Sequence, residues 1–105
     1  MSLKPVDAAT VKKWIDAGDA VLIDVRERNE HAAEHIAEAR LVPLSELEKH
    51  DIKNLGKKHV IFHCKGGMRT TANAARLADA CEAELFEMTG GIEGWKKAGL
   101  PIKSA

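Results

Sequence analysis

The chain has 105 residues, of which 45% are apolar and 30% charged, and its 16 basic residues balance 16 acidic ones. This length suits one domain over residues 1–105, and the balanced charge provides no overall field that would draw the protein to nucleic acid or an anionic membrane. The chain shows neither an apolar leader nor the run of about 20 apolar residues that a membrane span needs, so we expect a cytoplasmic protein.

The first half of the chain alternates predicted helices and strands. Asp7 is placed to cap a helix that runs to about Ala17, where Gly18 suits a left-handed end. The apolar run 20–25 is continuous rather than alternating, which predicts a strand covered on both faces. Further along we expect a polar helical segment over 28–34, a strand over 39–44 and a short helix opened by Ser45.

The second half continues the alternation. Residues 59–64 are the most convincing buried strand, and this strand ends on a cysteine. An alanine-rich helix is predicted over 70–81, a strand over 84–88 and a last helix over 92–98. Strands and helices that alternate in this way predict an α/β fold with a mostly parallel sheet and helices on both faces.

The two cysteines differ in their surroundings, and we expect both to be free thiols because nothing indicates an oxidising compartment. Cys64 ends a predicted strand, where ligands bind in parallel sheets, and two glycines and two cations follow it in residues 65–69. Glycines permit a turn whose N–H groups converge on one anion, and the nearby cations and helix start favour the thiolate. Cys64 is therefore predicted as the nucleophile. Cys81, on the apolar face of a predicted helix, is predicted to be a packing residue.

Four segments resemble motifs of the rhodanese-like sulfurtransferases, in order and at that family's spacings over nearly the whole chain. They are the loop 64–70, residues 24–27, Glu30 with His35-Ile36 and Ala39, and 90–95 with Leu100-Pro101. The resemblance implies a rhodanese-like fold, with a five-stranded parallel sheet flanked by helices, and a cysteine that holds a sulfane sulfur as a persulfide. Relatives often have a glycine and a proline-glycine pair where this chain has Glu34 and Ala37-Glu38.

The resemblance also implies that the loop after Cys64 surrounds the transferred sulfur. The substrate-binding residues would be Lys65, Gly66, Gly67, Met68, Arg69 and Thr70. The sulfur would come from a small-molecule donor such as thiosulfate and go to cyanide or to a thiol, including a protein thiol. We expect no cofactor, and Lys65 and Met68 are the candidates for donor choice, with the alternative that both are solvated side chains.

Two other functions stay open. A cysteine phosphatase or arsenate reductase is the enzymatic rival, because related loops close around oxyanions, and a non-catalytic interaction or regulatory module is the rival of another class. The intact cysteine and loop disfavour the module.

Several polar residues outside the loop also suggest chemistry. His31 to His35 match the H-x-x-E-H pattern of a zinc-peptidase class, but so short a match is easily met by chance, and we expect no metal. Asp24 and Arg26 are expected to order neighbouring loops through charge-assisted hydrogen bonds. His63 should point to the opposite side of its strand from Cys64, so it is not expected to act as a general base.

Overall fold

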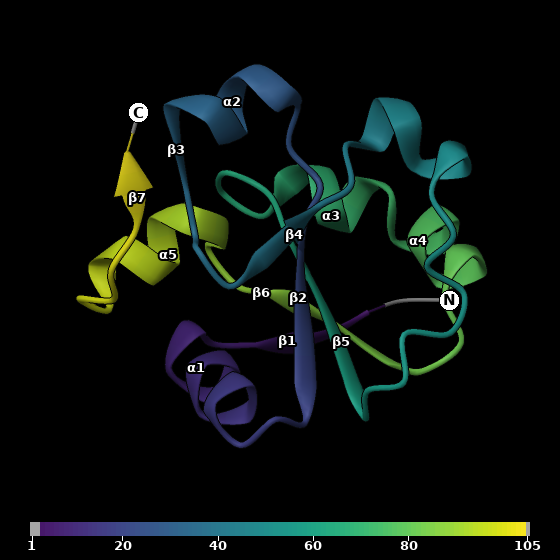
Figure 1. The fold of residues 1–105 in the computed structure, drawn as a ribbon, viewed down its shortest axis with the longest axis horizontal. Helices are drawn as coiled ribbons and strands as arrows, with labels where there is room; N and C mark the ends of the chain where they lie inside the picture. Colours follow the sequence, from purple (N-terminus) through teal and green to yellow (C-terminus); the bar gives the residue numbers. More distant parts are fainter. Residues whose placement is uncertain (1–2, 105) are drawn as a thin grey trace.

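The protein, described here from a computed structural model over residues 3–104, is built on a five-stranded sheet in the order β1-β6-β5-β2-β4 (Figure 1). The strands are β1 (Lys4–Val6), β2 (Ala20–Asp24), β4 (Ala39–Leu41), β5 (His59–His63) and β6 (Glu84–Met88). Every neighbouring pair in this sheet is parallel. The predicted α/β class and five-stranded parallel sheet are confirmed.

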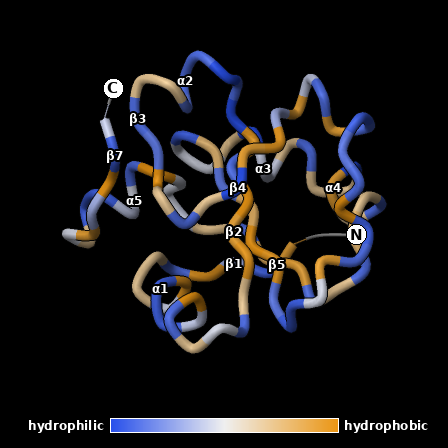
Figure 2. Tube along the Cα trace, in the orientation of Figure 1, coloured by the Kyte–Doolittle hydropathy of each residue, from blue (hydrophilic) through white to orange (hydrophobic). Residues whose placement is uncertain are grey.

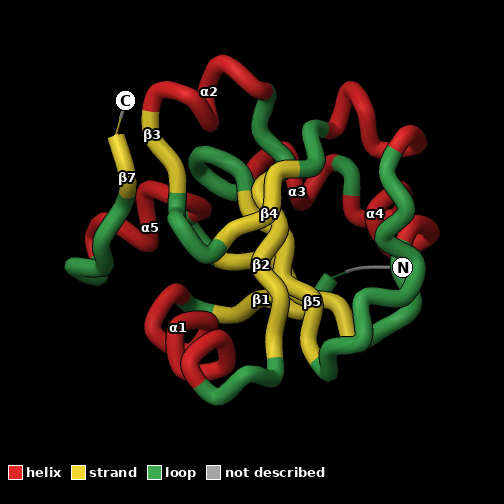
Figure 3. The backbone as a smooth tube through the Cα atoms, viewed as in Figure 1, coloured by secondary structure: helices red, strands yellow, loops and turns green. Residues whose placement is uncertain are grey.

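In the view of Figure 3, helices lie to the left of the strands, above them and to their right, and loops border them at the lower right. They are α1 (Ala8–Asp16), α2 (Arg28–Ala33), the 3-10 helix η1 (Leu44–Lys49), α3 (Met68–Ala72), α4 (Ala74–Ala80) and α5 (Gly91–Lys97). A small antiparallel pair, β3 (Glu34–His35) with β7 (Lys103–Ser104), lies apart from the main sheet. Within residues 3–104 no helix combines the length and the apolarity needed to cross a membrane.

Most residues of the central strands β2 and β5 are hydrophobic (Figure 2), and nearly all are buried, as the continuous runs in the sequence predict. Leu22 and Ile61 belong to a core shared with α1 and α5, whereas Ile23 and Phe62 belong to a core shared with η1 and α4. Successive side chains of a strand point to opposite faces, so two separate cores result. Burial on both faces fixes the position of β5, whose end carries the predicted nucleophile.

The prediction of one helix over 70–81 is wrong in its bounds, because two helices, α3 and α4, occupy this part of the chain. Asn73 interrupts them with a non-helical backbone, and its side-chain amide donates a hydrogen bond of 2.8 Å to the carbonyl of Arg69. Asparagine side chains compete for backbone carbonyls in this way and weaken a helix interior. α4 ends at Ala80, so Cys81 lies just after the helix in extended backbone rather than on a helix face.

The strand β1 is absent from the sequence prediction. It is three residues long and contains Pro5, which cannot donate to a ladder and is tolerated at a sheet edge. β1 forms that edge, pairing with β6. The strand predicted over 39–44 ends earlier, at Leu41, two residues before Pro43.

Candidate functional site

Cys64 follows β5 directly, at the carboxyl end of the parallel sheet. Asp24 is the register partner of His63, and the N–H of Val25 donates to the carbonyl of His63 at 3.0 Å. The segment after β2 therefore runs beside the segment after β5. Cys64 is only 1% exposed, so its sulfur lies beneath the loop that follows it.

The loop folds back over the sulfur of Cys64. The N–H of Gly67 donates to Sγ at 3.1 Å, and the buried Thr70 places its hydroxyl oxygen 3.9 Å from Sγ. Thr70 also donates a hydrogen bond of 2.9 Å to the carbonyl of Gly67. Gly67 has φ +104°, a left-handed conformation that favours glycine. The loop thus turns at least one backbone donor toward the sulfur.

The predicted loop residues differ in exposure. Lys65, Gly66 and Met68 are exposed, Gly67 and Arg69 are half-buried, and Thr70 is buried. Met68 is the only large apolar side chain exposed within residues 3–104, at 84%. The Met68 side chain therefore extends into solvent, whereas Thr70 lies in the interior of the loop.

A hollow of about 360 Å³ opens beside Cys64. It is lined by Cys64, Lys65, Gly66, Met68, Arg69 and Glu93. A second hollow of about 450 Å³ shares Gly66 and Met68 with the first and also includes Gly67 and Gly90 in its lining. Most of the predicted residues therefore meet at one opening. Glu93 was not predicted, although it lies within the 90–95 motif.

The guanidinium of Arg69 faces Glu30 on α2. It donates two hydrogen bonds to the carboxylate, of 2.6 and 2.7 Å, across 39 positions of sequence. These bonds lower the pKa of Glu30 to about 2, although partial burial acts in the opposite direction. The positive charge of Arg69 is thereby directed largely at Glu30, and the pair ties α3, the helix that follows the Cys64 loop, to α2.

Replacing Glu30 with glutamine should destabilise the protein by about 1 kcal/mol at pH 7, the upper range for a partly exposed pair. Because the folded-state pKa of Glu30 is lower than its ordinary 4.5, the stabilisation is fully present above pH 4.5 and is lost as the pH falls toward 2. Urea unfolding of wild type and Glu30→Gln at a series of pH values measures this. The two free energies of unfolding should converge as the pH falls from 4.5 toward 2, and a difference independent of pH would contradict the assignment.

Asp24 and Arg26 form a buried ion pair next to the loop. The guanidinium donates from Nη2 to Oδ2 at 2.8 Å and from Nε to Oδ1 at 3.0 Å, and it also donates to the carbonyl of Glu34 at 2.7 Å. Burial disfavours the charge of Asp24, but the bonds from Arg26 outweigh it, so the pKa of Asp24 is lowered. This arrangement connects the end of β2 with the end of α2.

His63 is buried between Asp24 and the backbone of the loop. Its Nδ1 lies 3.1 Å from the carbonyl oxygen of Cys64, and its Nε2 lies 3.7 Å from Oδ2 of Asp24. Burial lowers the pKa of His63, against the attraction of the Asp24 carboxylate. The ring contacts the carbonyl oxygen of Cys64 rather than its sulfur. This geometry therefore gives no support to His63 as a general base for the thiol.

Cys81 does not line the hollow at Cys64, although both cysteines belong to the core that η1 and α4 cover. Burial together with the nearby Glu82 raises the pKa of the Cys81 thiol. A raised pKa disfavours the reactive thiolate. Both cysteines are free thiols.

The H-x-x-E-H segment forms no cluster of the kind that binds metal. The rings of His31 and His35 stack with centroids 4.0 Å apart, and Nδ1 of His35 lies 2.9 Å from the carbonyl of His31. Residues 3–104 contain no group of three or more His, Cys, Asp or Glu side chains placed to hold a metal ion.

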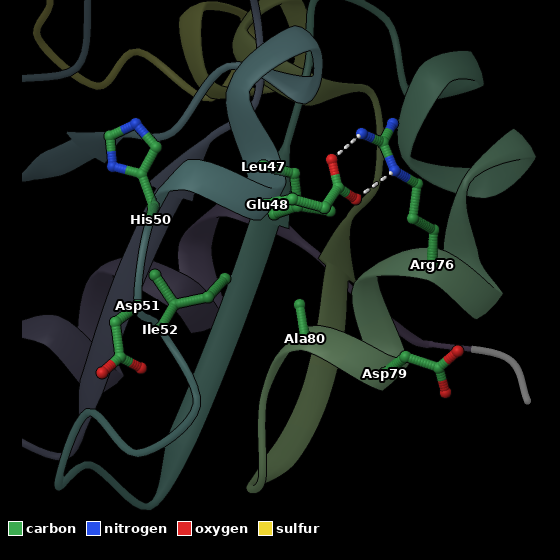
Figure 4. A pocket seen from close by; sticks show the side chains of 8 residues that line it. All are labelled: Leu47, Glu48, His50, Asp51, Ile52, Arg76, Asp79 and Ala80. Atoms are coloured by element: carbon green, nitrogen blue, oxygen red, sulfur yellow. Dashed lines mark hydrogen bonds and ion pairs between the residues drawn. The ribbon is translucent and has the colours of Figure 1, made fainter.

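A further hollow of about 360 Å³ lies between η1 and α4 (Figure 4). Figure 4 shows Glu48 and Arg76 facing each other across it, joined by hydrogen bonds of 2.7 and 2.9 Å. Its lining includes neither cysteine and none of the predicted loop residues. The loop after β5 therefore remains the candidate site.

Comparison with known proteins gives the same family over most of the chain. The Rhodanese-like domain family matches residues 7–98. The thiosulfate sulfurtransferase GlpE of Coxiella burnetii is 27% identical over 96 residues, which cover 91% of this chain and 90% of that protein. The HTH-type transcriptional regulator Rv0324 of Mycobacterium tuberculosis is 31% identical over 102 residues, covering 93% of this chain and 45% of the regulator.

Solved structures agree with the sequence relatives. A crystal structure of a rhodanese-related protein from Thermoplasma volcanium superposes with a TM-score of 0.80 at 28% identity, covering 95% of this chain and 97% of that one. The chain spans nearly all of this protein and of the sulfurtransferase but about half the length of the regulator. By the extent of the match, by its fold and by its relatives, this chain belongs to the rhodanese-like domain family.

Proposed function

We propose that the protein is a sulfurtransferase in which Cys64 carries the sulfur. The observation that supports this best is the hydrogen bond from the N–H of Gly67 to Sγ of Cys64, 3.1 Å long, at the carboxyl end of a parallel sheet. The Cys64 thiolate attacks the outer sulfur of a donor such as thiosulfate. The sulfur–sulfur bond of the donor breaks, sulfite leaves with the bonding electrons, and a persulfide remains on Cys64.

The second half of the reaction returns the enzyme to its first state. Cyanide or a thiolate attacks the outer sulfur, and the Cys64 thiolate leaves as the new bond forms. Neither half needs a proton at the sulfur, which agrees with a His63 ring that contacts a carbonyl instead. The persulfide carries its charge on the outer sulfur, where backbone N–H donors can stabilise it. Free thiols persist in a reducing cytoplasm, which is where we propose that the reaction takes place.

The relatives support this proposal to different degrees. GlpE of Coxiella burnetii, which matches over nearly its full length, is described as a thiosulfate sulfurtransferase. The Mycobacterium tuberculosis regulator, about half of which matches, leaves a regulatory role as the alternative. The intact cysteine and the N–H of Gly67, which donates a hydrogen bond to its sulfur, favour catalysis.

The proposal is tested by steady-state kinetics with thiosulfate and cyanide. A persulfide intermediate predicts a ping-pong pattern, in which reciprocal plots at several fixed cyanide concentrations are parallel. Intersecting lines would indicate that donor and acceptor must be bound together, and absence of thiocyanate formation with any sulfane donor would favour the regulatory alternative.

Phosphatase activity is expected to be at background. Four residues separate Cys64 from Arg69, one fewer than in the C-x5-R loop of cysteine phosphatases, so the ring of amides encloses a smaller space. In addition, Arg69 is engaged by Glu30 and would have to leave it to bind a phosphoryl group. Hydrolysis of an aryl phosphate is the measurement. Turnover by wild type that Cys64→Ser abolishes would contradict this expectation.

A further inference from the structure

The first turn of α5 is hydrogen-bonded to the backbone of the catalytic loop. The N–H of Ile92 donates to the carbonyl of Cys64 at 2.9 Å, and the N–H of Glu93 donates to the carbonyl of Lys65 at 3.1 Å. The first N–H groups of a helix have no partner inside the helix, so they are free to make such bonds. Two consecutive carbonyls of the loop are therefore held by one element from far along the chain.

These two bonds determine the orientation of the loop's amides. In a trans peptide unit the carbonyl and the N–H point in opposite directions, and residues 3–104 contain no cis peptide bond. With the carbonyls of Cys64 and Lys65 turned to α5, the N–H groups of Lys65 and Gly66 must point away from α5. α5 thus fixes the two peptide units that lead to the Gly67 N–H, which donates to Sγ.

Gly91 is what lets α5 approach so closely. A Cβ atom at this position would lie 2.3 Å from the carbonyl oxygen of Cys64 and 2.6 Å from that of Lys65, where ordinary contact begins at 3.4 Å. The obstructing atoms are backbone, so a side chain at residue 91 would displace the loop carbonyls or α5 by about 1 Å. Gly91 also has φ +56°, which adds strain for any other residue.

We propose that Gly91 is a positioning residue for sulfur transfer: by admitting the first turn of α5 to the Cys64 and Lys65 carbonyls, it aims the loop amides at the sulfur. The inference rests on the proposed reaction at Cys64. It differs from a role in stability alone, because it predicts slower chemistry in protein that is still folded.

The chain contains a matched control at the other end of the same helix. Gly99 has φ +79°, but a Cβ atom there would meet nothing within 4 Å. Gly91→Ala and Gly99→Ala therefore share the backbone strain, and only the first disturbs the loop. The readouts are the single-turnover rate of sulfur transfer from thiosulfate to Cys64 and, independently of that reaction, the rate of Cys64 alkylation as a function of pH, both on protein whose folding is checked by circular dichroism.

We expect Gly91→Ala to slow sulfur transfer on the order of 10²-fold, the effect of misplacing catalytic groups by about 1 Å, and to shift its alkylation profile. Gly99→Ala should keep the wild-type rate and profile. Equal behaviour of the two variants, with wild type active, would overturn the inference and leave the proposed function intact. An inactive wild type would instead refute the proposed function.

A second variant decides the matter if Gly91→Ala does not fold. Cys81 precedes α5, so a synthetic segment 81–105 can be ligated to residues 1–80 at that cysteine, with the Ile92 amide replaced by an ester. The ester removes the N–H donor to Cys64 and leaves every side chain in place. Transfer should slow about fivefold relative to the ligated all-amide chain, the effect of one hydrogen bond. An unchanged rate in the folded ester would contradict the inference.

Discussion

Cys64→Ser is expected to lower the rate of thiocyanate formation from thiosulfate and cyanide by more than about 10³-fold, to background, because a serine hydroxyl is a poor nucleophile at neutral pH and cannot form a persulfide. The substitution exchanges one atom, and the serine oxygen can accept the hydrogen bond that the N–H of Gly67 donates to Sγ, so the fold should persist. The loss can therefore be assigned to chemistry.

Cys81→Ser is the matched control for this variant, since both thiols are buried and free. Cys81 follows α4 and, unlike Cys64, does not line the hollow at the loop. A buried serine hydroxyl there should reduce stability by about 1–3 kcal/mol without changing turnover of the folded protein. Loss of turnover in Cys81→Ser, or survival of turnover in Cys64→Ser, would mean that the assignment of Cys64 as the nucleophile is wrong.

Asp24→Asn should have the largest effect on stability, a loss of about 3–5 kcal/mol at pH 7. Removing the carboxylate leaves the charge of Arg26 buried without a counterion, which costs far more than the net contribution of an intact buried pair. Glu46→Gln is the matched control, because Glu46 pairs with the largely exposed Arg28. That variant should lose no more than about 1 kcal/mol.

Urea unfolding at pH 7 measures both losses. The pKa of Asp24 in the folded protein is below its ordinary 3.8, so its stabilisation is present above that pH and is lost as the pH falls further. The deficit of Asp24→Asn should therefore shrink in acid. Similar small losses in both variants would mean that the buried Asp24–Arg26 pair contributes no more to the free energy of unfolding than the exposed Glu46–Arg28 pair.

Local patterns in the sequence were enough to predict most of the strands. The runs at 20–25 and 59–64 are mostly apolar and contain several β-branched residues, so burial and propensity agree. The candidate site could also be proposed from local pattern, because a strand end, a cysteine and two glycines stand in one short segment. β1 was not, since three residues with a proline carry too little pattern and depend on pairing with β6.

The contacts that support the loop could not be predicted in the same way. Arg69 and Glu30 are 39 positions apart, and a basic residue after Cys64 suggests an interaction with the sulfur until α2 is seen to bring a carboxylate to it. The bonds from Ile92 and Glu93 join backbone groups, which no side-chain pattern encodes. Similarly, the break at Asn73 lies within an alanine-rich stretch that favours continuous helix.

The most direct test of sulfur transfer at Cys64 is intact-protein mass spectrometry before and after exposure to thiosulfate, followed by cyanide. Lys65, Arg69 and Arg76 lie between the cysteines, so tryptic peptides report on Cys64 and Cys81 separately. We predict that the protein gains the mass of one sulfur atom, that the added sulfur maps to Cys64, and that cyanide removes it. Sulfur on Cys81, or no added sulfur with any sulfane donor, would contradict the account.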